Sequence, residues 1–280
     1  MKSILKKVFS SKYRAKFDAR YGIGRLERLF FSNWFNIFAT IWINFRCLPF
    51  KQAIKLPIFA YGNPKFLSLS GKIEIKSSIR IGMIKFNYTF PGAPNNKSSD
   101  TAIYLLGVLV FTGGGGICTG CMIRIAYDGI LELGKNSRIM DGCNISCDKR
   151  ISIGENTQLA HRCQIFDGNF HYVANIRKHI ISSIWSEVSI GKNCWICNST
   201  TINKGCNIPD GSIVASHSLV TKDFSDYPVG SFFAGNPARF ICDGMTRVFN
   251  TDLESKVFHS YLIDGVKDFP VSNLTLEDCW

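Results

Sequence analysis

The sequence predicts an all-β fold, a parallel β-solenoid of triangular cross-section, and the main reason is a ladder of aliphatic residues at six-residue steps. Six is the period of neither an α-helix nor a single strand, so the ladder is an internal repeat. Three steps make one coil, with the aliphatic residues inside the prism. The ladder consists of Ile153, Leu159 and Ile165, followed by Ile190, Ile196, Ile202, Ile208, Val214 and Val220. The predicted stacked pairs, three steps apart, are Ile190 with Ile208, Ile196 with Val214, and Ile202 with Val220.

Composition agrees with this fold class. The chain has 280 residues, 46% of them hydrophobic, which is enough for a large core in one or two domains. Twenty-four glycines and only 19% charged residues favour strands joined by tight turns. Eleven cysteines, an odd number, follow an N-terminus that does not resemble a secretory signal. This favours a reducing compartment over a disulfide framework.

Residues 1–50 form a basic, aromatic-rich segment. Residues 1–60 contain twelve Lys and Arg residues against Asp18 and Glu27, a net charge of +10 out of the total of +12. Such a segment suits a membrane surface or a lipid-linked phosphate better than nucleic acid. The uncharged stretch 29–45 is too short and too rich in asparagine to span a bilayer. It is either an interfacial anchor or, the reading we favour, a helical turn followed by a first strand, Thr40–Phe45, packed on the body.

Residues 51–241 are expected to form the solenoid. Its early part contains short apolar alternations at Lys65–Leu69, Lys72–Ile75 and Ile79–Lys85. A loop is expected over Pro91–Asp100 and a break over Gly113–Gly116. The ladder resumes at Leu133, Ile139 and Ile145, and the eight-residue step from Ile145 to Ile153 predicts a two-residue insertion. The solenoid needs caps at its ends, for which the N-terminal segment and the tail, residues 242–280, are the candidates.

The ladder lapses between Ile165 and Ile190. A step of six from Ile165 reaches His171, so an imidazole takes the place of an aliphatic rung. From His171 to Ile190 there are thirteen residues more than a regular step requires. Residues 166–187 are therefore expected to project as a loop.

Several motifs resemble those of the hexapeptide-repeat acyltransferases, and most of all the sugar O-acetyltransferases that act on bacterial surface polysaccharides. They are IGKNCWIC at 190–197, INKGCNIPDG at 202–211, VTK at 220–222, AGNPARFI at 234–241 and IFDGNFH at 165–171. The resemblance implies a left-handed parallel β-helix, a homotrimer with active sites between subunits, and acetyl-CoA as the co-substrate. Handedness comes from the resemblance alone.

His171 is the predicted catalytic base. A sugar hydroxyl is a weak nucleophile near neutral pH, and a neutral imidazole is suited to take its proton as it attacks a thioester. Asp167 and Asn169 in the same segment are candidates for orienting the ring or contacting the acceptor; many relatives carry Asp where Asn169 stands. Asn144 and Trp185 are candidate contacts to the acceptor. No nucleophile stands beside His171 in the sequence, which predicts direct transfer without an acyl-enzyme.

The resemblance also implies which residues contact acetyl-CoA. Small residues at the coil corners would let the pantetheine lie along the coils, and cations would meet the phosphates. The positions that match the family's coenzyme contacts are Asn198, Ser216, Thr221, Lys222 and Arg239.

Other functions are weaker alternatives. Two Cys-x-x-Cys pairs, Cys118–Cys121 and Cys194–Cys197, are too far apart for a zinc ribbon, and no metal is expected. His161, His171 and His217 lack a recognisable spacing for a metal-dependent carbonic anhydrase. N-acetylation of an amino sugar and a non-catalytic scaffold remain open. The predicted enzyme is a cytoplasmic O-acetyltransferase, peripheral at the inner face of the cytoplasmic membrane if the N-terminal segment binds lipid, with a glycan acceptor and no nucleic acid.

Overall fold

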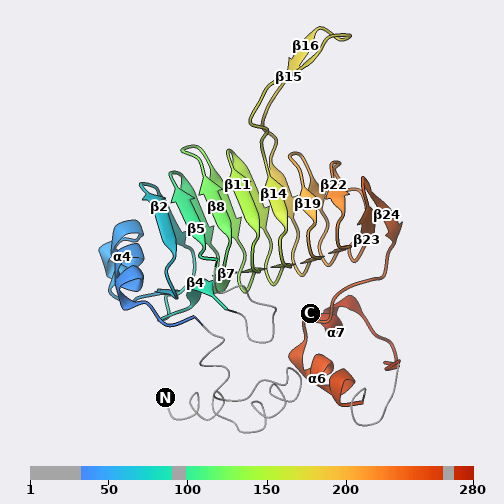
Figure 1. The fold of residues 1–280 in the computed structure, drawn as a ribbon. Coiled ribbons are helices and arrows are strands. Elements are labelled where there is room, and N and C mark those ends of the chain that lie inside the picture. Colours follow the sequence, from blue (N-terminus) through green and yellow to red (C-terminus); the bar gives the residue numbers. More distant parts are fainter. Residues whose placement is uncertain (1–32, 90–98, 261–267) are drawn as a thin grey trace.

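The computed structural model describes residues 33–89, 99–260 and 268–280, and it shows a three-sided solenoid (Figure 1). The first sheet has the order β1 (Ile58–Ala60), β4 (Ile84–Tyr88), β7 (Gly115–Cys118), β10 (Arg138–Ile139), β13 (Gln158–Leu159), β18 (Trp195–Ile196), β21 (Ile213–Val214), β23 (Phe232–Gly235) and β24 (Ala238–Cys242). The second has β2 (Lys65–Leu69), β5 (Ala102–Leu105), β8 (Met122–Ile125), β11 (Asn144–Cys147), β14 (Gln164–Phe166), β19 (Thr201–Ile202) and β22 (Leu219–Val220). The third has β20 (Asn207–Ile208), β17 (Val188–Ile190), β12 (Arg150–Ile153), β9 (Ile130–Leu133), β6 (Val108–Phe111) and β3 (Lys72–Ile75).

The aliphatic ladder is the core, as predicted. Strands that are neighbours within a sheet come from successive coils and run parallel, except at β23 and β24. The three predicted stacked pairs occur in register, and their side chains are at most 3% exposed. Arg138 pairs with Gln158 on the next coil. Their separation in the sequence is two residues longer than a regular coil of three six-residue steps, which confirms the two-residue insertion. The fold is the predicted parallel β-helix, and its repeating strand order is consistent with the left-handed form.

Three corners join the sheets. The first corner, between the first and second sheets, comprises residues 119–121, 141–143, 161–163, 198–200 and 216–218 of successive coils. The second corner leads from the second sheet to the third, and the third corner leads back to the first sheet. Side chains at these corners, unlike the rungs, can face solvent.

The early coils differ in two places from the sequence predictions, although β2 and β3 have the predicted bounds. The predicted strand at Ile79–Lys85 is divided by a turn at Gly82, with φ +59°. Only its last two residues belong to a strand, as the start of β4. Gly115 and Gly116 belong to β7 and do not form a break. Gly116 is required there because a Cβ would lie 2.5 Å from the Tyr88 ring. The predicted loop at 91–100 lies largely outside the described residues.

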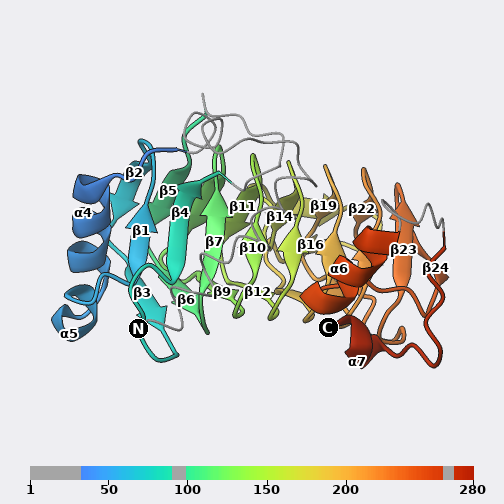
Figure 2. The same ribbon diagram turned by 90° about the horizontal axis from the view of Figure 1, so that it is seen from below.

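The N-terminal end of the solenoid is covered by α4 (Ile37–Cys47), followed by α5 (Phe50–Ala53) (Figure 2). The prediction of a strand at Thr40–Phe45 was wrong, since the segment lies inside α4. The Asn36 side chain accepts the Ala39 N–H as an N-cap, and Thr40, Ile43, Asn44 and Cys47 form one buried helical face. The basic stretch before residue 33 lies outside the described residues.

Two polar side chains of this helix replace a missing coil. β1 is the edge strand of the first sheet. The Asn44 side chain donates to the Ile58 carbonyl at 2.7 Å and accepts the Ile58 N–H at 3.2 Å, while Thr40 Oγ1 accepts the Ala60 N–H at 2.9 Å. Since buried backbone groups need partners, these contacts allow the solenoid to end at β1. The asparagine that argues against a membrane span is therefore part of the cap.

The other end is closed by the β23–β24 hairpin and an aromatic cluster. Phe224 and Phe233 stack with ring centroids 4.2 Å apart, and Tyr227 stacks on Phe240 at 4.8 Å. The tail, with α6 (Thr251–His259) and α7 (Leu276–Cys279), does not cap this end as expected. Because the cluster already covers it, the tail packs along the side: Arg247 lies over the Trp195 ring at 5.7 Å and hydrogen-bonds to Gln158. No helix in the described ranges has the length and apolar character needed to cross a bilayer.

A long arm leaves the second corner between β14 and β17. It ends in an antiparallel hairpin, β15 (Val173–Asn175) and β16 (Ile180–Ser182), which stands well clear of the solenoid in Figure 1. The ladder resumes after the arm, where Val188 and Ile190 pair with Ile151 and Ile153. His171 is therefore not a substituted rung. It lies on the arm, because the insertion begins before the sixth residue of the step.

A buried carboxylate fixes the root of this arm. Asp167 is 0% exposed, and its Oδ1 accepts the Asp148 N–H at 2.7 Å. Its Oδ2 accepts the N–H groups of Lys149 and Arg150, each also at 2.7 Å. One side chain thereby satisfies three backbone donors at the corner of the preceding coil. Hydrogen bonds to a charged acceptor are among the stronger ones in proteins.

We predict that Asp167→Asn destabilises the protein, because an amide would turn an N–H₂ group towards backbone donors and leave buried N–H groups unpaired. The expected loss is about 2–4 kcal/mol in the free energy of unfolding. Denaturant unfolding at matched protein concentration measures it. The control is Asp148→Asn, which affects a partly exposed pair with Arg124 and should cost about 1 kcal/mol or less. Equal stability of Asp167→Asn and the parent would contradict this role.

Candidate active site

The predicted base, His171, lies exposed on the arm. The arm root is held by hydrogen bonds from Asn169 N–H to the Ile184 carbonyl at 2.8 Å and from Ser186 N–H to the Asp167 carbonyl at 2.9 Å. The carboxylate of Asp167 is engaged at the second corner, and no hydrogen bond or ion pair joins it to His171 within the described part of the chain. Asn169 is exposed beside it. The three predicted catalytic residues therefore share the root of the arm, but one chain does not assemble them into a hydrogen-bonded unit.

Cations of the preceding coils contact aromatic residues of the arm root. Lys149 Nζ lies 5.9 Å from the centre of the Trp185 ring, and the Arg124 guanidinium lies 5.8 Å from that of Phe170. Arg124 also pairs with Asp148 at 2.8 Å. Trp185, predicted to contact the acceptor, is 42% exposed. These contacts orient the arm as it leaves the solenoid.

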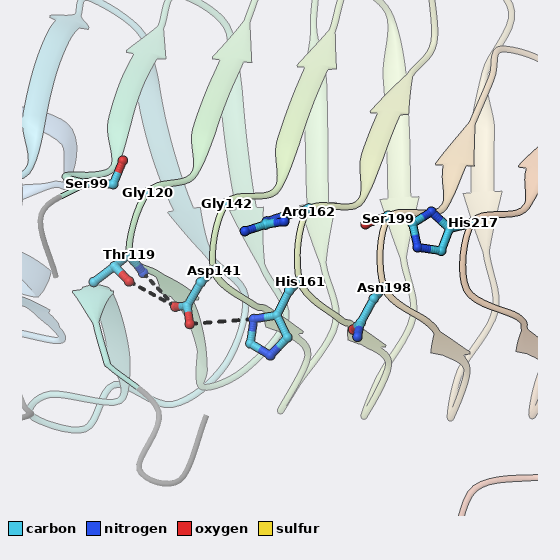
Figure 3. Close-up of a pocket in the computed structure, with 10 residues that line it drawn as sticks. All are labelled: Ser99, Thr119, Gly120, Asp141, Gly142, His161, Arg162, Asn198, Ser199 and His217. Atoms are coloured by element: carbon cyan, nitrogen blue, oxygen red, sulfur yellow. Dashed lines mark hydrogen bonds and ion pairs between the residues drawn. The ribbon is translucent and has the colours of Figure 1, made fainter. Parts of the chain in front are cut away.

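A polar groove follows the first corner (Figure 3). Its cavity volume is about 450 Å³. Residues at the same position of successive coils form a row along it, because each corner N–H bonds to the carbonyl of the row residue one coil earlier. The row comprises Thr119, Asp141, His161, Asn198 and Ser216. Figure 3 shows the first four of these on one side of the corner.

Within this groove Asp141 and His161 form a pair. Thr119 donates to Asp141 Oδ1 twice, from its hydroxyl at 3.0 Å and its backbone N–H at 3.2 Å. Asp141 Oδ2 lies 3.6 Å from His161 Nδ1. Burial raises the pKa of Asp141, whereas the Thr119 hydrogen bonds and the His161 charge act in the opposite direction. The pair therefore joins a buried carboxylate to an imidazole that reaches the groove.

The predicted donor and acceptor contacts are divided between corners. Asn198 and Ser216 lie in the first-corner row, and Asn144 opens β11 just after that corner. Thr221 and Lys222 follow β22 and belong to the second corner, like the arm. The width of the second sheet separates the two groups, roughly 10 Å for a four-residue strand. Arg239 lies on β24 opposite Ala234, with its side chain exposed.

The pair of Asp141 and His161 is not among the site residues predicted from the sequence, where His161 appears only with His171 and His217 as a possible metal ligand. The spacing between Asp141 and His161 in the sequence could have revealed the pair. It equals the spacing between Arg138 and Gln158, which pair on neighbouring strands, and so corresponds to one full coil in this part of the solenoid. Polar residues at equal corner positions of consecutive coils must stack, just as the aliphatic rungs do.

The cysteines lie inside the fold. Cys118, Cys121 and Cys194 are buried, and Cys197 is partly so. Burial raises the pKa of the Cys194 thiol to about 12 and that of Cys197 to about 11, which keeps both in the thiol form. In the described residues, no group of three or more His, Cys, Asp or Glu side chains is placed to hold a metal ion.

Proteins similar in sequence include two acetyltransferases, although no family model matches the chain. The galactoside O-acetyltransferase of Escherichia coli K12 is 26% identical over 160 residues, which cover 57% of this chain and 74% of that protein. The putative acetyltransferase YvoF of Bacillus subtilis strain 168 is 35% identical over 99 residues. That match covers 35% of this chain and only about half, 51%, of YvoF.

Solved structures of similar proteins include two sugar-related acetyltransferases. The polySia-specific acetyltransferase NeuO covers 74% of this chain and 99% of its own, with 18% identity and a TM-score of 0.44. A maltose O-acetyltransferase from Clostridium difficile 630 covers 52% of this chain and 68% of its own, with 28% identity and a TM-score of 0.36. In sequence the chain is similar to acetyltransferases, among them a galactoside O-acetyltransferase. Its stacked six-residue repeats agree with the resemblance of its motifs to the hexapeptide-repeat acyltransferases.

Proposed function

We propose that this protein is an acetyl-CoA-dependent O-acetyltransferase that acetylates a hydroxyl group of a sugar. The acceptor is a surface polysaccharide, either O-antigen or capsule, or a lipid-linked precursor. The match to a galactoside O-acetyltransferase supports the reaction. The observation that carries the proposal is the position of His171, which lies exposed on the projecting arm, where a substrate can reach it.

We further propose a homotrimer with its active sites between subunits. His171 has no hydrogen-bond or ion-pair partner among the described residues of its own chain. The predicted coenzyme contacts are split between the first and second corners, on opposite sides of the second sheet. An arm that reaches over the first-corner groove of a neighbouring copy would bring His171, Asn144 and Asn198 to one place. The exposed Lys222 and Arg239 would meet the coenzyme phosphates.

The chemistry follows from a neutral imidazole beside a hydroxyl and a thioester. His171 takes the hydroxyl proton as the oxygen attacks the acetyl carbonyl, and the tetrahedral intermediate collapses with cleavage of the C–S bond. The imidazolium then protonates the departing CoA thiolate. Backbone N–H groups at the corners are candidates for stabilising the oxyanion. Transfer is direct, since no nucleophile stands beside His171 in the sequence.

His171→Gln should lower kcat/KM by roughly 10²–10⁴-fold, the usual contribution of a general base. The thermal midpoint should stay unchanged, because the ring is exposed. CoA release with a galactoside, maltose or a polysialic acid oligomer as acceptor measures the activity, and glucosamine tests for N-acetylation. His259→Gln, on α6, is the matched histidine control. Full activity of His171→Gln with a working acceptor would refute the assignment.

Subunit complementation tests where the site is assembled. Asn198→Arg should block the first-corner groove, and His171→Gln should remove the base, so each homo-oligomer should be inactive. Co-expression should restore part of the parent activity, because some interfaces in mixed trimers combine an intact arm with an intact groove. Recovery would be absent if each chain built its own complete site. Light scattering with size-exclusion chromatography measures the oligomeric state of the same samples.

The outer face of α4 and α5 suits a peripheral contact with a membrane. The buried face of α4 contains the polar residues that cap β1, and large aromatic residues lie on its outer face: Phe38 is 82% exposed and Trp42 59%. Phe50 of α5 is 70% exposed. Exposed cations flank them at Arg46, Lys51 and Lys55. Aromatic residues beside basic ones are typical of proteins that bind the headgroup region of anionic bilayers. We therefore propose a peripheral contact with a membrane, which for the expected cytoplasmic enzyme is the inner face of the cytoplasmic membrane.

The double variant Phe38→Ser/Trp42→Ser should reduce flotation with phosphatidylcholine vesicles containing phosphatidylserine by several-fold. Binding of the parent should also weaken at high salt, because cations contribute to it. Leu274→Ser, at an exposed apolar residue of the tail, is the control and should float like the parent. Equal flotation of the double variant and the parent would exclude this face as the contact.

A further inference from the structure

The first-corner groove contains a carboxylate whose hydrogen-bonding capacity is half used. Asp141 is 6% exposed, and Thr119 holds its Oδ1 with two hydrogen bonds. Its Oδ2 is buried and has no hydrogen-bond partner among the described residues. The imidazole of His161 lies close by, with its Nδ1 3.6 Å from this oxygen. A buried carboxylate oxygen without a hydrogen bond is costly, so the arrangement needs an explanation.

Asp141 determines how His161 can interact with a ligand. A carboxylate beside Nδ1 favours the proton on that nitrogen, which leaves Nε2 with a free lone pair. Figure 3 shows Nδ1 turned to Asp141 and the other ring nitrogen pointing away from that carboxylate. The His161 side chain is 22% exposed, so a ligand can reach it. The ring is thus oriented to accept a hydrogen bond.

We propose that His161, oriented by Asp141, binds a hydroxyl group of the acceptor sugar by accepting its hydrogen bond at Nε2. This inference rests on the proposed function and adds a residue that decides which acceptor is held. The cavity volume of about 450 Å³ falls within the usual range for small-molecule sites. Asn198, the predicted coenzyme contact, is the next row residue after His161. A sugar bound at His161 would therefore lie beside the predicted coenzyme site.

The roles of the two histidines differ. His171 would act on the hydroxyl that reacts, whereas His161 would hold another hydroxyl of the same sugar. Asp141 is a positioning residue, since it acts through His161, and Thr119 supports Asp141 in turn. Loss of His161 should therefore weaken acceptor binding, while loss of His171 should slow the reaction. A purely structural pair would affect neither constant selectively.

The test compares steady-state constants of His161→Gln and Asp141→Asn with those of the parent. The acceptor is whichever of methyl β-galactoside, maltose and a polysialic acid oligomer the parent acetylates fastest. We expect the acceptor KM to rise about tenfold in both variants, while kcat and the KM for acetyl-CoA stay within about twofold. The double variant should be no worse than His161→Gln, because the two residues act as one unit. Thr119→Val should raise the acceptor KM by a smaller factor.

Thermal unfolding controls for misfolding, and His161→Asn provides a second variant if His161→Gln does not fold. An unchanged acceptor KM in folded variants of an active parent would overturn this inference alone. So would an equal rise in the KM for acetyl-CoA, which would mark a donor contact, or a loss confined to kcat. If the parent acetylates none of the acceptors, the proposed function fails, and this inference fails with it.

Discussion

The structure depends on the hydrogen bonding of each coil to the next. In a parallel solenoid the backbone of one coil is satisfied only by its neighbours, so every place where a coil is missing or irregular needs a substitute. Three substitutes are visible. Asn44 and Thr40 of α4 replace the coil before β1, the β23–β24 hairpin ends the first sheet, and Asp167 supplies acceptors where the arm interrupts the second corner. The interior between them is filled by the aliphatic ladder.

This arrangement restricts where function can reside. The aliphatic ladder residues are buried and all apolar, so polar groups able to bind a ligand can lie only at the corners or on an insertion. Stacking of the coils then aligns these polar groups, because residues at the same corner position of successive coils form a row. The first-corner groove is such a row, and it places Asp141, His161 and Asn198 side by side although they come from three different coils.

The same restriction explains why the arm and the groove of one chain lie apart. The arm leaves the second corner, the groove follows the first, and the second sheet separates them. In the proposed homotrimer, a neighbouring copy brings an arm and a groove together. The tail and α4 pack elsewhere, against the first sheet and the end of the solenoid, which leaves the arm and the groove uncovered by the described parts of their own chain.

The sequence by itself determined the solenoid, because a six-residue aliphatic period has no other regular structure to satisfy it, and the stacked pairs followed from counting. It also located the insertion and the family motifs. It did not determine the helix over Thr40–Phe45, since β-branched residues there suggest a strand and only the free edge of β1 explains the buried asparagine. Nor did it reveal that Asp167 holds a corner, that His171 stands off the ladder, or that Asp141 meets His161. Those features depend on which coil lies against which, and on the direction in which an insertion leaves its corner, and both are properties of the tertiary structure.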